Sequence, residues 1–362
     1  MNHYDVIVIG AGQAGLAASY FLKKKGVKFL ILEAASRTGS SWLKRYDSLK
    51  LFTYSRYNNL PGLEFPGEKD RFPTKDEVAA YLQFYAEYFE LPIVPKSKVD
   101  LLVPAMKGFV VNTRDLTYEC DNVVVATGPF QTPFIPLFSN SIDLSIRQFH
   151  SSEYKNPAQL DVGDTLVVGA GNSGVQIVEE LVEAKRKVFF SFSGDLKRFP
   201  NNGITQRLIF GSGLTCLSKT SAVGSMIYKR GEPIMGTNIT KLFAAPNLQI
   251  VGRATEAQGM EIHCEGKVLN TISNIIWSTG FRPDFSWIKS DIFDGKGFPV
   301  QRRGVTDIEG LYFLGLSWMH SRNSGLLGGA RDDAEFVVKH LLHRMPAKLN
   351  YSERLFNQQK SS

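Results

Sequence analysis

Two stretches of the chain repeat one order of hydrophobic and polar positions. In the first stretch, an apolar run at 4–9 precedes a glycine-rich turn at 10–15 and a helical pattern that stops at Gly26. A second apolar run covers 27–32 and ends on Glu33. This order predicts a strand, a helix and a second, parallel strand, which together form a βαβ unit.

The same order returns later in the chain. An apolar run at 165–168 precedes a glycine-rich turn at 169–174, and a helical pattern at 175–184 leads to a further apolar run at 188–192. One side of that helix carries the apolar residues, as packing on a sheet requires. Two such units favour an α/β fold with two Rossmann-like dinucleotide-binding domains over a repeat of short period.

Periodicity predicts further elements between the two units. A capping box at 74–77 begins a helix that stops before Pro92. Buried strands at 122–126 and 272–277 each lead into a Thr-Gly pair. Three short apolar runs predict a small β-meander, at 99–103, 109–112 and 118–120.

The remaining segments are a lid and a C-terminal helix. Residues 199–245 are less periodic and rich in Gly, Asn and Ser, so we expect an insertion or lid over the second unit. A last strand at 311–314 precedes a loop and a helix from about 325 to 342. The polar tail 346–362 is expected to fray.

Composition places the chain among ordinary globular proteins. It has 362 residues, 43% hydrophobic and 21% charged, and its three cysteines form no C-x-x-C pair. Its net charge of +7 comes from scattered basic residues, which argues against a nucleic-acid partner. No apolar run reaches the length of a membrane span, and the dispersed histidines predict no metal site. We therefore expect a cytoplasmic protein.

The first glycine turn carries the strongest chemical signal. Gly10 allows the tight turn, Gly12 lets a pyrophosphate approach the backbone, and Gly15 lets the helix pack on the strand. The helix N-terminus supplies N–H groups and the positive end of a dipole to the phosphates. Glu33 is placed to accept hydrogen bonds from a ribose 2′-OH. The alternative is a structural turn without a ligand.

The second turn lacks an acid at the end of its following strand. Ser191 and Ser193 stand there, and Lys197 and Arg198 follow. Hydroxyls and cations accept a 2′-phosphate that an acid would repel, which favours NADPH, with NADH as the alternative because Asp195 lies nearby. Two dinucleotide sites make chemical sense if one cofactor delivers a hydride and a flavin receives it.

Over roughly residues 4 to 343 the chain resembles the flavin-dependent monooxygenases related to flavin-containing monooxygenases and Baeyer–Villiger enzymes. It looks most like their compact bacterial members. The resemblance rests on the order and spacing of eight segments. They are 10–15 (GAGQAG), 37–42 (RTGSSW), 51–53 (LFT), 72–74 (FPT), 126–128 (ATG), 169–174 (GAGNSG), 278–283 (STGFRP) and 310–315 (GLYFLG).

The resemblance implies an FAD domain into which an NAD(P) domain is inserted. The FAD domain would comprise 1–157 and 281–345, and the NAD(P) domain 158–280, with 199–245 as its lid. Implied FAD-binding residues are Gly10, Gly12, Gln13, Ala14, Gly15, Glu33, Gly39, Ser40, Ser41, Trp42, Thr127, Gly128, Gly315 and Leu326. Implied NAD(P)-binding residues are Gly169, Gly171, Asn172, Ser173, Gly174, Ser191, Ser193, Lys197, Arg198, Thr279 and Gly280.

A family fingerprint, F-x-G-x-x-x-H-x-x-x-(Y or F)-(K or R), is matched in its second half by His150, Tyr154 and Lys155. Leu144 and Ile146 replace its Phe and Gly. Tyr154 stands where Baeyer–Villiger members carry Trp, which favours the N- and S-oxygenating branch. The alternative for His150 is a structural histidine near the domain junction.

Pocket candidates lie in two loops. Tyr54 stands where the family often has an Asn near the flavin, and His320, Arg322 and Asn323 follow the last strand. Ordinary hydrogen bonding within the loop is the alternative for each. We expect no protein nucleophile, because the flavin carries the chemistry.

The resemblance implies that reduced FAD captures O2 as a C4a-(hydro)peroxide and oxygenates a small soft nucleophile, a sulfide or amine, or else a ketone. The protein would act as a homodimer on a small-molecule substrate. Two other functions stay open. One is an NAD(P)H-dependent flavin oxidase or reductase that passes electrons to O2 or a quinone. The other is a non-catalytic redox-sensing accessory protein of a transport system.

Overall fold

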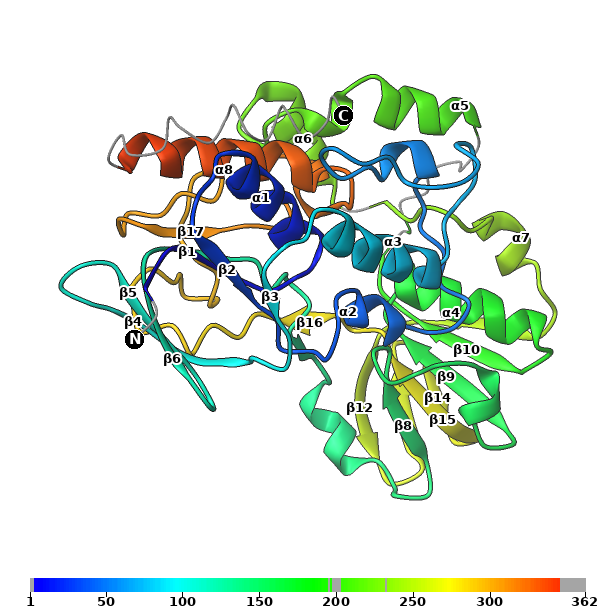
Figure 1. The fold of residues 1–362 in the computed structure, drawn as a ribbon. Helices are drawn as coiled ribbons and strands as arrows, with labels where there is room; N and C mark the ends of the chain where they lie inside the picture. Colours follow the sequence, from blue (N-terminus) through cyan, green and yellow to red (C-terminus); the bar gives the residue numbers. More distant parts are fainter. Residues whose placement is uncertain (1–2, 195, 197–202, 232, 346–362) are drawn as a thin grey trace.

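The computed structural model describes residues 3–194, 196, 203–231 and 233–345. Two sheets dominate these residues, and each carries one of the two glycine turns at the end of a central strand (Figure 1). The predicted α/β class with two Rossmann-like units is confirmed. The predicted domain boundaries remain a prediction.

The first sheet has seven strands in the order β3-β2-β1-β6-β5-β4, and β17 also pairs with β6. Pairing among β1, β2, β3, β6 and β17 is parallel, whereas β4, β5 and β6 form an antiparallel meander. The strands are β1 (His3–Ile9), β2 (Phe29–Leu32), β3 (Ile93–Val94), β4 (Val99–Pro104), β5 (Phe109–Thr113), β6 (Thr117–Val125) and β17 (Leu311–Phe313).

The second sheet is wholly parallel, in the order β11-β10-β9-β15-β8. Its strands are β8 (Arg147–His150), β9 (Asp164–Val168), β10 (Val188–Ser191), β11 (Leu248–Val251) and β15 (Ile272–Trp277). Strand β8 belongs to this sheet although it precedes the expected boundary at 157. A three-stranded antiparallel sheet that periodicity did not predict packs beside it, formed by β12 (Ala254–Gln258), β13 (Glu261–Cys264) and β14 (Lys267–Leu269).

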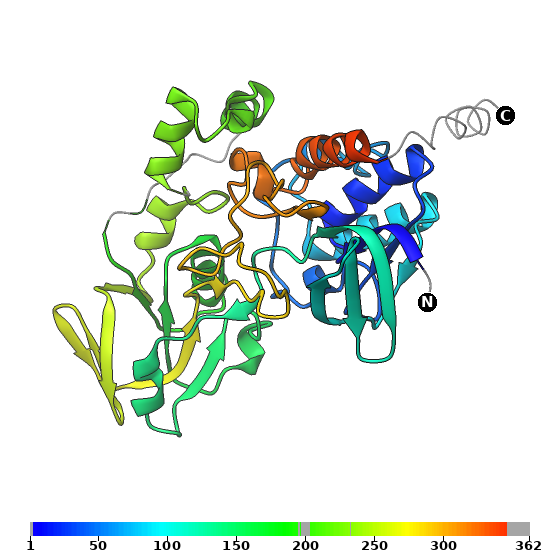
Figure 2. The same cartoon turned by 90° about the vertical axis from the view of Figure 1, so that its left-hand side faces the viewer.

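Helices cover the sheets. Figure 1 shows α1 and α8 side by side over the first sheet and α4 beside the second. The helices are α1 (Gln13–Lys24), α2 (Ser40–Leu43), α3 (Lys75–Tyr88), α4 (Asn172–Glu183), α5 (Gly203–Gln206), α6 (Ala222–Arg230), α7 (Ile239–Phe243) and α8 (Ala330–Arg344). Thr74 and Glu77 form the predicted capping box at the start of α3. Figure 2 shows the helices of 203–231 standing apart as a separate layer.

Two sequence predictions of elements were wrong. The strands expected at 118–120 and 122–126 are one continuous strand, β6, because its first half pairs with β5 and its last residues pair with β17. The helix expected from 325 begins at Ala330. A single turn of 3-10 helix, η6 (Arg322–Gly325), precedes it, and Gly329 lies against the backbone of Asn323.

Candidate functional site

The first turn has the geometry that a dinucleotide requires. Gly10 has φ +106°, and a Cβ there would lie 2.7 Å from the Ala126 carbonyl oxygen. A Cβ on Gly15 would lie 1.9 Å from the Gly10 carbonyl oxygen. A Cβ on Gly12 would meet no atom within 4 Å. Gly10 and Gly15 are therefore required by the protein's own packing, whereas Gly12 keeps open the space that a pyrophosphate would fill.

Glu33 supports the same turn from the end of β2. Its Oε2 accepts a hydrogen bond from Ala11 N at 2.7 Å, and its Oε1 accepts one from Ala35 N at 2.8 Å. Each carboxylate oxygen keeps a second lone pair for a ribose hydroxyl. The carboxylate is thus held in place before any ligand arrives.

The second turn repeats these relations. Gly169 has φ +102°, and its Cβ would lie 2.4 Å from the Ser278 carbonyl oxygen. A Cβ on Gly174 would lie 1.9 Å from the Gly169 carbonyl oxygen, while one on Gly171 would meet no described residue beyond its chain neighbours within 4 Å. Helix α4 begins at Asn172, so its free N–H groups border the same open space.

Two segments connect the sheets next to these turns. Gly128 and Gly280 have φ +75° and +84°, and neither would place a Cβ within 4 Å of a described residue other than its chain neighbours. Strands β7 (Thr132–Pro133) and β16 (Phe281–Arg282) pair and join the segments into a ribbon. Thr127 accepts a hydrogen bond from Gln131 Nε2 at 2.9 Å, and Thr279 donates one to the Phe134 carbonyl. We call 127–134 and 279–282 the crossing segments.

The other residues expected at FAD lie around the first turn. Gly39 has φ +81°, and its Cβ would lie 2.7 Å from the Ala79 carbonyl of α3. Ser40 donates to the Arg37 carbonyl, Ser41 is exposed, and Trp42 packs against the first core. Gly315 packs on Ala14, since an added Cβ would lie 2.8 Å from the Ala14 Cβ. Gln13 opens α1, and Leu326 ends η6.

Of the two hydroxyls expected at the 2′-phosphate, that of Ser191 is hydrogen-bonded to the protein's own backbone. Ser191 is buried, and its Oγ donates to the Gly252 carbonyl at 2.9 Å and accepts from Ala254 N at 2.9 Å. Ser193 is exposed at the end of β10. Lys197 and Arg198 lie outside the described residues. Ser193 is therefore the available hydroxyl among the described candidates.

The fingerprint residues are bonded within the protein. His150 is buried, with Nδ1 2.8 Å from Ser152 Oγ and Nε2 3.0 Å from the Gly280 carbonyl oxygen, and burial lowers its pKa. Tyr154 donates to Glu180 Oε2 at 2.7 Å, and Lys155 donates to the Lys44 carbonyl. His150 thus contacts the crossing segment 279–282, Tyr154 contacts α4, and Lys155 contacts the C-terminal end of α2.

The four pocket candidates all contact the segment 203–245. Gln206, which is fully buried, donates to the Phe52 carbonyl at 2.6 Å and accepts from Tyr54 N at 3.3 Å. The His320 carbonyl accepts from Lys219 N at 2.8 Å. Arg322 Nη2 lies 3.8 Å from Met235 Sδ, and Asn323 Nδ2 lies 3.0 Å from Cys216 Sγ.

These contacts change the expected position of the lid. The segment bridges the loops of the first unit around Tyr54 and His320, in addition to packing α7 on the second core. Met235 N also donates to Asn172 Oδ1 at 2.9 Å, which ties the segment to the second turn. The segment therefore contacts both units. Sequence reasoning missed Gln206, because nothing in its local pattern marks a buried anchor.

Sequence reasoning also missed Tyr46. It is buried, and its hydroxyl donates to Gln176 Oε1 of α4 at 2.7 Å. Burial is the largest effect that raises the pKa of Tyr46 to about 12, and a hydrogen bond with Ser173 opposes it. A side chain from the first unit thus reaches the first turn of α4, at the second nucleotide turn.

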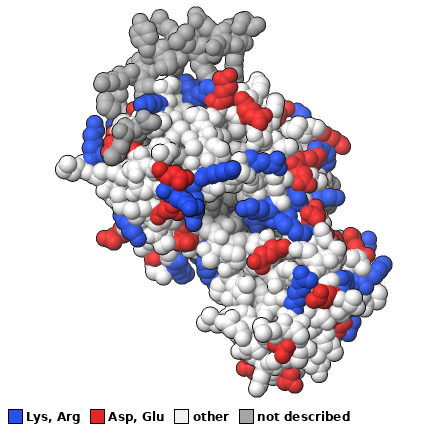
Figure 3. All heavy atoms as spheres, turned by 60° about the horizontal axis from the view of Figure 1, so that its bottom comes forward, with Lys and Arg blue, Asp and Glu red and all other residues white. Residues whose placement is uncertain are grey.

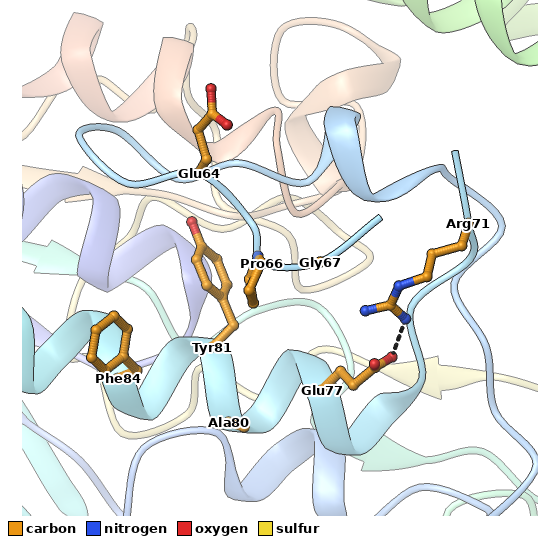
Figure 4. A pocket seen from close by; sticks show the side chains of 8 residues that line it. All are labelled: Glu64, Pro66, Gly67, Arg71, Glu77, Ala80, Tyr81 and Phe84. Atoms are coloured by element: carbon orange, nitrogen blue, oxygen red, sulfur yellow. Dashed lines mark hydrogen bonds and ion pairs between the residues drawn. The ribbon is translucent and has the colours of Figure 1, made fainter. Parts of the chain in front are cut away.

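A pocket of about 450 Å³ lies elsewhere, between the loop 64–71 and α3 (Figure 4). Arg71 crosses it to donate to Glu77 Oε2 at 2.7 Å. None of its lining residues belongs to the two turns or the crossing segments. Within the described ranges, no group of His, Cys, Asp and Glu could hold a metal, and no helix is long and apolar enough to cross a membrane.

Comparison with known proteins agrees with this geometry. Residues 7–204 match the model of the family described as pyridine nucleotide-disulphide oxidoreductase. The uncharacterised oxidoreductase CzcO of Bacillus subtilis is 42% identical over 93% of this chain and 99% of its own length. The probable indole-3-pyruvate monooxygenase YUCCA1 of Arabidopsis thaliana is 29% identical over 90% of this chain and 87% of its own.

A solved structure covers nearly the whole molecule. The flavin-containing monooxygenase of Stenotrophomonas maltophilia superposes with a TM-score of 0.79 at 25% identity, over 95% of this chain and 99% of that one. The two glycine turns of the present chain fit the predicted cofactors, FAD and NADPH. The chain belongs to the pyridine nucleotide-disulphide oxidoreductase family and is an oxidoreductase of its flavin monooxygenase type.

Proposed function

We propose that the protein uses NADPH, with NADH as the alternative, and O2 to oxygenate a small soft nucleophile, a sulfide or an amine. A ketone is the second substrate class. One oxygen atom enters the substrate and the other leaves as water, while NADPH and a proton supply two electrons and two protons. The observation that carries this proposal is the pair of open glycine turns joined by the crossing segments.

Bound FAD would accept the hydride and activate O2. The chain's own residues would bind the two cofactors, orient them and exclude water from the site. Gly12 and Gly171 leave room for the two pyrophosphates, and the N-termini of α1 and α4 offer N–H groups to them. The segment anchored by Gln206 covers the loops that carry the pocket candidates, which supports exclusion of water from that region.

The proposal is tested by reducing the purified flavoprotein with NADPH or NADH in a stopped-flow instrument without oxygen, then analysing products in air with a panel of thioethers and tertiary amines. Oxygenated product formed in proportion to NADPH consumed supports it. Hydrogen peroxide as the sole product with every substrate indicates an oxidase or reductase. Failure of both nicotinamides to reduce the flavin indicates an accessory protein. The homodimer and the cytoplasmic location remain predictions.

A further inference from the structure

Among the described residues, Arg45 at the junction of the two units has no partner of opposite charge. Arg45 follows α2, and its guanidinium carbon lies 5.3 Å from the ring centroid of Phe130 and 5.4 Å from that of Phe281. The two rings are 5.4 Å apart and come from the two crossing segments. Within the described ranges, the guanidinium makes no hydrogen bond and no ion pair. Burial lowers the pKa of Arg45.

Basic side chains lie near Arg45, and Asp47, Glu153 and Glu180 are the acidic groups that act on the same neighbouring residues. Lys44 precedes it, and the Lys155 ammonium donates to the Lys44 carbonyl. The pKa of Lys155 is lowered by burial first and then by Lys75, and Arg45 and Lys44 add to this effect, while Asp47 opposes it. Figure 3 shows several Lys and Arg side chains beside a hollow between the two lobes, with Asp and Glu side chains next to them. A half-buried guanidinium in such surroundings favours an anion.

The position of Arg45 indicates which anion it would take. The next residue, Tyr46, is bonded to Gln176 and Ser173 in the first turns of α4. Phe281 directly follows Gly280, in the segment on which the second glycine turn packs. Arg45 thus lies where the second turn and both crossing segments meet, and an arginine fork matches phosphate oxygens.

We propose that Arg45 is an anion-binding residue that contacts the pyrophosphate of the nicotinamide dinucleotide when it occupies the second turn. This rests on the proposed use of a nicotinamide cofactor. The two rings hold the guanidinium in place before the ligand arrives, so little side-chain freedom is lost on binding. The pyrophosphate of FAD has the same chemistry, and the test separates the two sources.

The test measures NADP+ binding to the FAD-loaded protein by calorimetry, for the wild type, Arg45→Met and Arg45→Lys. We expect Arg45→Met to weaken NADP+ about tenfold or more, with FAD content unchanged. Arg45→Lys recovers part of the affinity, because it keeps the charge and loses the planar fork. Inorganic pyrophosphate competes with NADP+ in the wild type and loses this ability in Arg45→Met.

Arg147→Met is the matched control. Arg147 also lies over a ring, 5.0 Å from the Phe149 centroid, but it is paired with Asp161 at 3.2 Å. The Arg147→Met variant also removes one positive charge from the protein, and we expect its NADP+ affinity to equal that of the wild type. Thermal unfolding and the flavin spectrum of each variant show whether it has folded.

Three results separate the conclusions. Wild-type NADP+ affinity in folded Arg45→Met overturns the inference, whether or not the protein oxygenates substrates. Loss of FAD from Arg45→Met with normal NADP+ binding also overturns it and assigns the residue to the flavin. NADP+ binding that depends on Arg45, in a protein that incorporates no oxygen, upholds the inference and contradicts the proposed function.

Discussion

At the scale of single residues, the two glycine turns divide into positions that the protein needs and positions that a ligand needs. Gly10 and Gly15 face backbone atoms, and Gly12 faces open space. The sequence predicts these roles well, because each depends on a short local motif and the elements beside it. Substitutions should therefore separate folding from cofactor binding.

Gly12→Ala should leave the apoprotein as stable as the wild type, because the added methyl group meets no protein atom within 4 Å. It should weaken FAD by roughly tenfold or more, since the methyl group fills the space for the pyrophosphate. Calorimetric titration of apoprotein with FAD measures this. Gly15→Ala is the comparison: its methyl group would lie 1.9 Å from the Gly10 carbonyl oxygen, so it should lower stability by about 1–3 kcal/mol. Equal stability of the two variants would refute this division of roles.

Gly171→Ala makes the corresponding change in the second turn. FAD content and thermal midpoint should match the wild type, while NADPH binding weakens by roughly tenfold or more. The rate of flavin reduction as a function of NADPH concentration gives the apparent affinity. A variant that keeps wild-type affinity would show that the pyrophosphate does not approach Gly171.

His150 should make stability depend on pH. Burial lowers its folded pKa below the ordinary value near 6.5, so the unfolded chain binds this proton first. The stability from neutral His150 is present above about pH 6.5 and is lost as pH falls through the folded pKa. Urea unfolding between about pH 7 and pH 5 should show a smaller loss for His150→Asn than for the wild type. The pKa values of His320 and His340 are lowered too, and these two residues contribute equally to the pH dependence of stability in both proteins. Parallel curves would contradict this role.

At the scale of elements, the structure departs from sequence periodicity where pairing or packing overrides local pattern. The two strands predicted at 118–120 and 122–126 left a break at Asp121, but β6 continues because it changes partner from β5 to β17 at that point. Helix α8 begins later than its apolar pattern suggests, because Gly328 and Gly329 pack against the backbone of Tyr57 and Asn323. Both features depend on contacts with residues distant in sequence, and a local periodic pattern carries no information about such contacts.

The segment 203–245 shows the same limit. Several of its contacts join residues more than a hundred positions apart, such as Gln206 with Phe52 and Tyr54. Composition indicated a lid, but only the fold shows which loops it contacts. Sequence reasoning missed the site at Arg45 for the same reason, because the two rings that hold its guanidinium come from two distant segments.

Gln206→Ala should loosen the lid. It removes the hydrogen bonds that Gln206 makes with the Phe52 carbonyl and with Tyr54 N, and it leaves the Phe52 carbonyl without this buried donor. We expect the free energy of unfolding to fall by about 1–3 kcal/mol. We expect several-fold more hydrogen peroxide per NADPH consumed, with FAD content unchanged, because water reaches the flavin more readily. Gln258→Ala, at an exposed position of β12, is the control. Peroxide release equal to that of the control would show that this anchor does not seal the site.

At the scale of the whole molecule, two nucleotide-binding units meet at one junction. The crossing segments, the pair Arg45 and Tyr46, and the segment 203–245 all contact elements of both units. Local motifs predicted both units and the two strands that each lead into a Thr-Gly pair. The junction itself required the structure, because it is built from single contacts spread along the chain.

The central claim is that electrons from NADPH are used to transfer oxygen to a substrate, and that they are not lost as released hydrogen peroxide. The most direct test supplies isotopically labelled dioxygen to the FAD-loaded protein with NADPH and a thioether, and measures the label in the sulfoxide by mass spectrometry. We expect about one labelled oxygen atom per sulfoxide and a yield close to the NADPH consumed. Unlabelled sulfoxide would contradict the account, and so would one hydrogen peroxide released per NADPH oxidised with every thioether, amine and ketone.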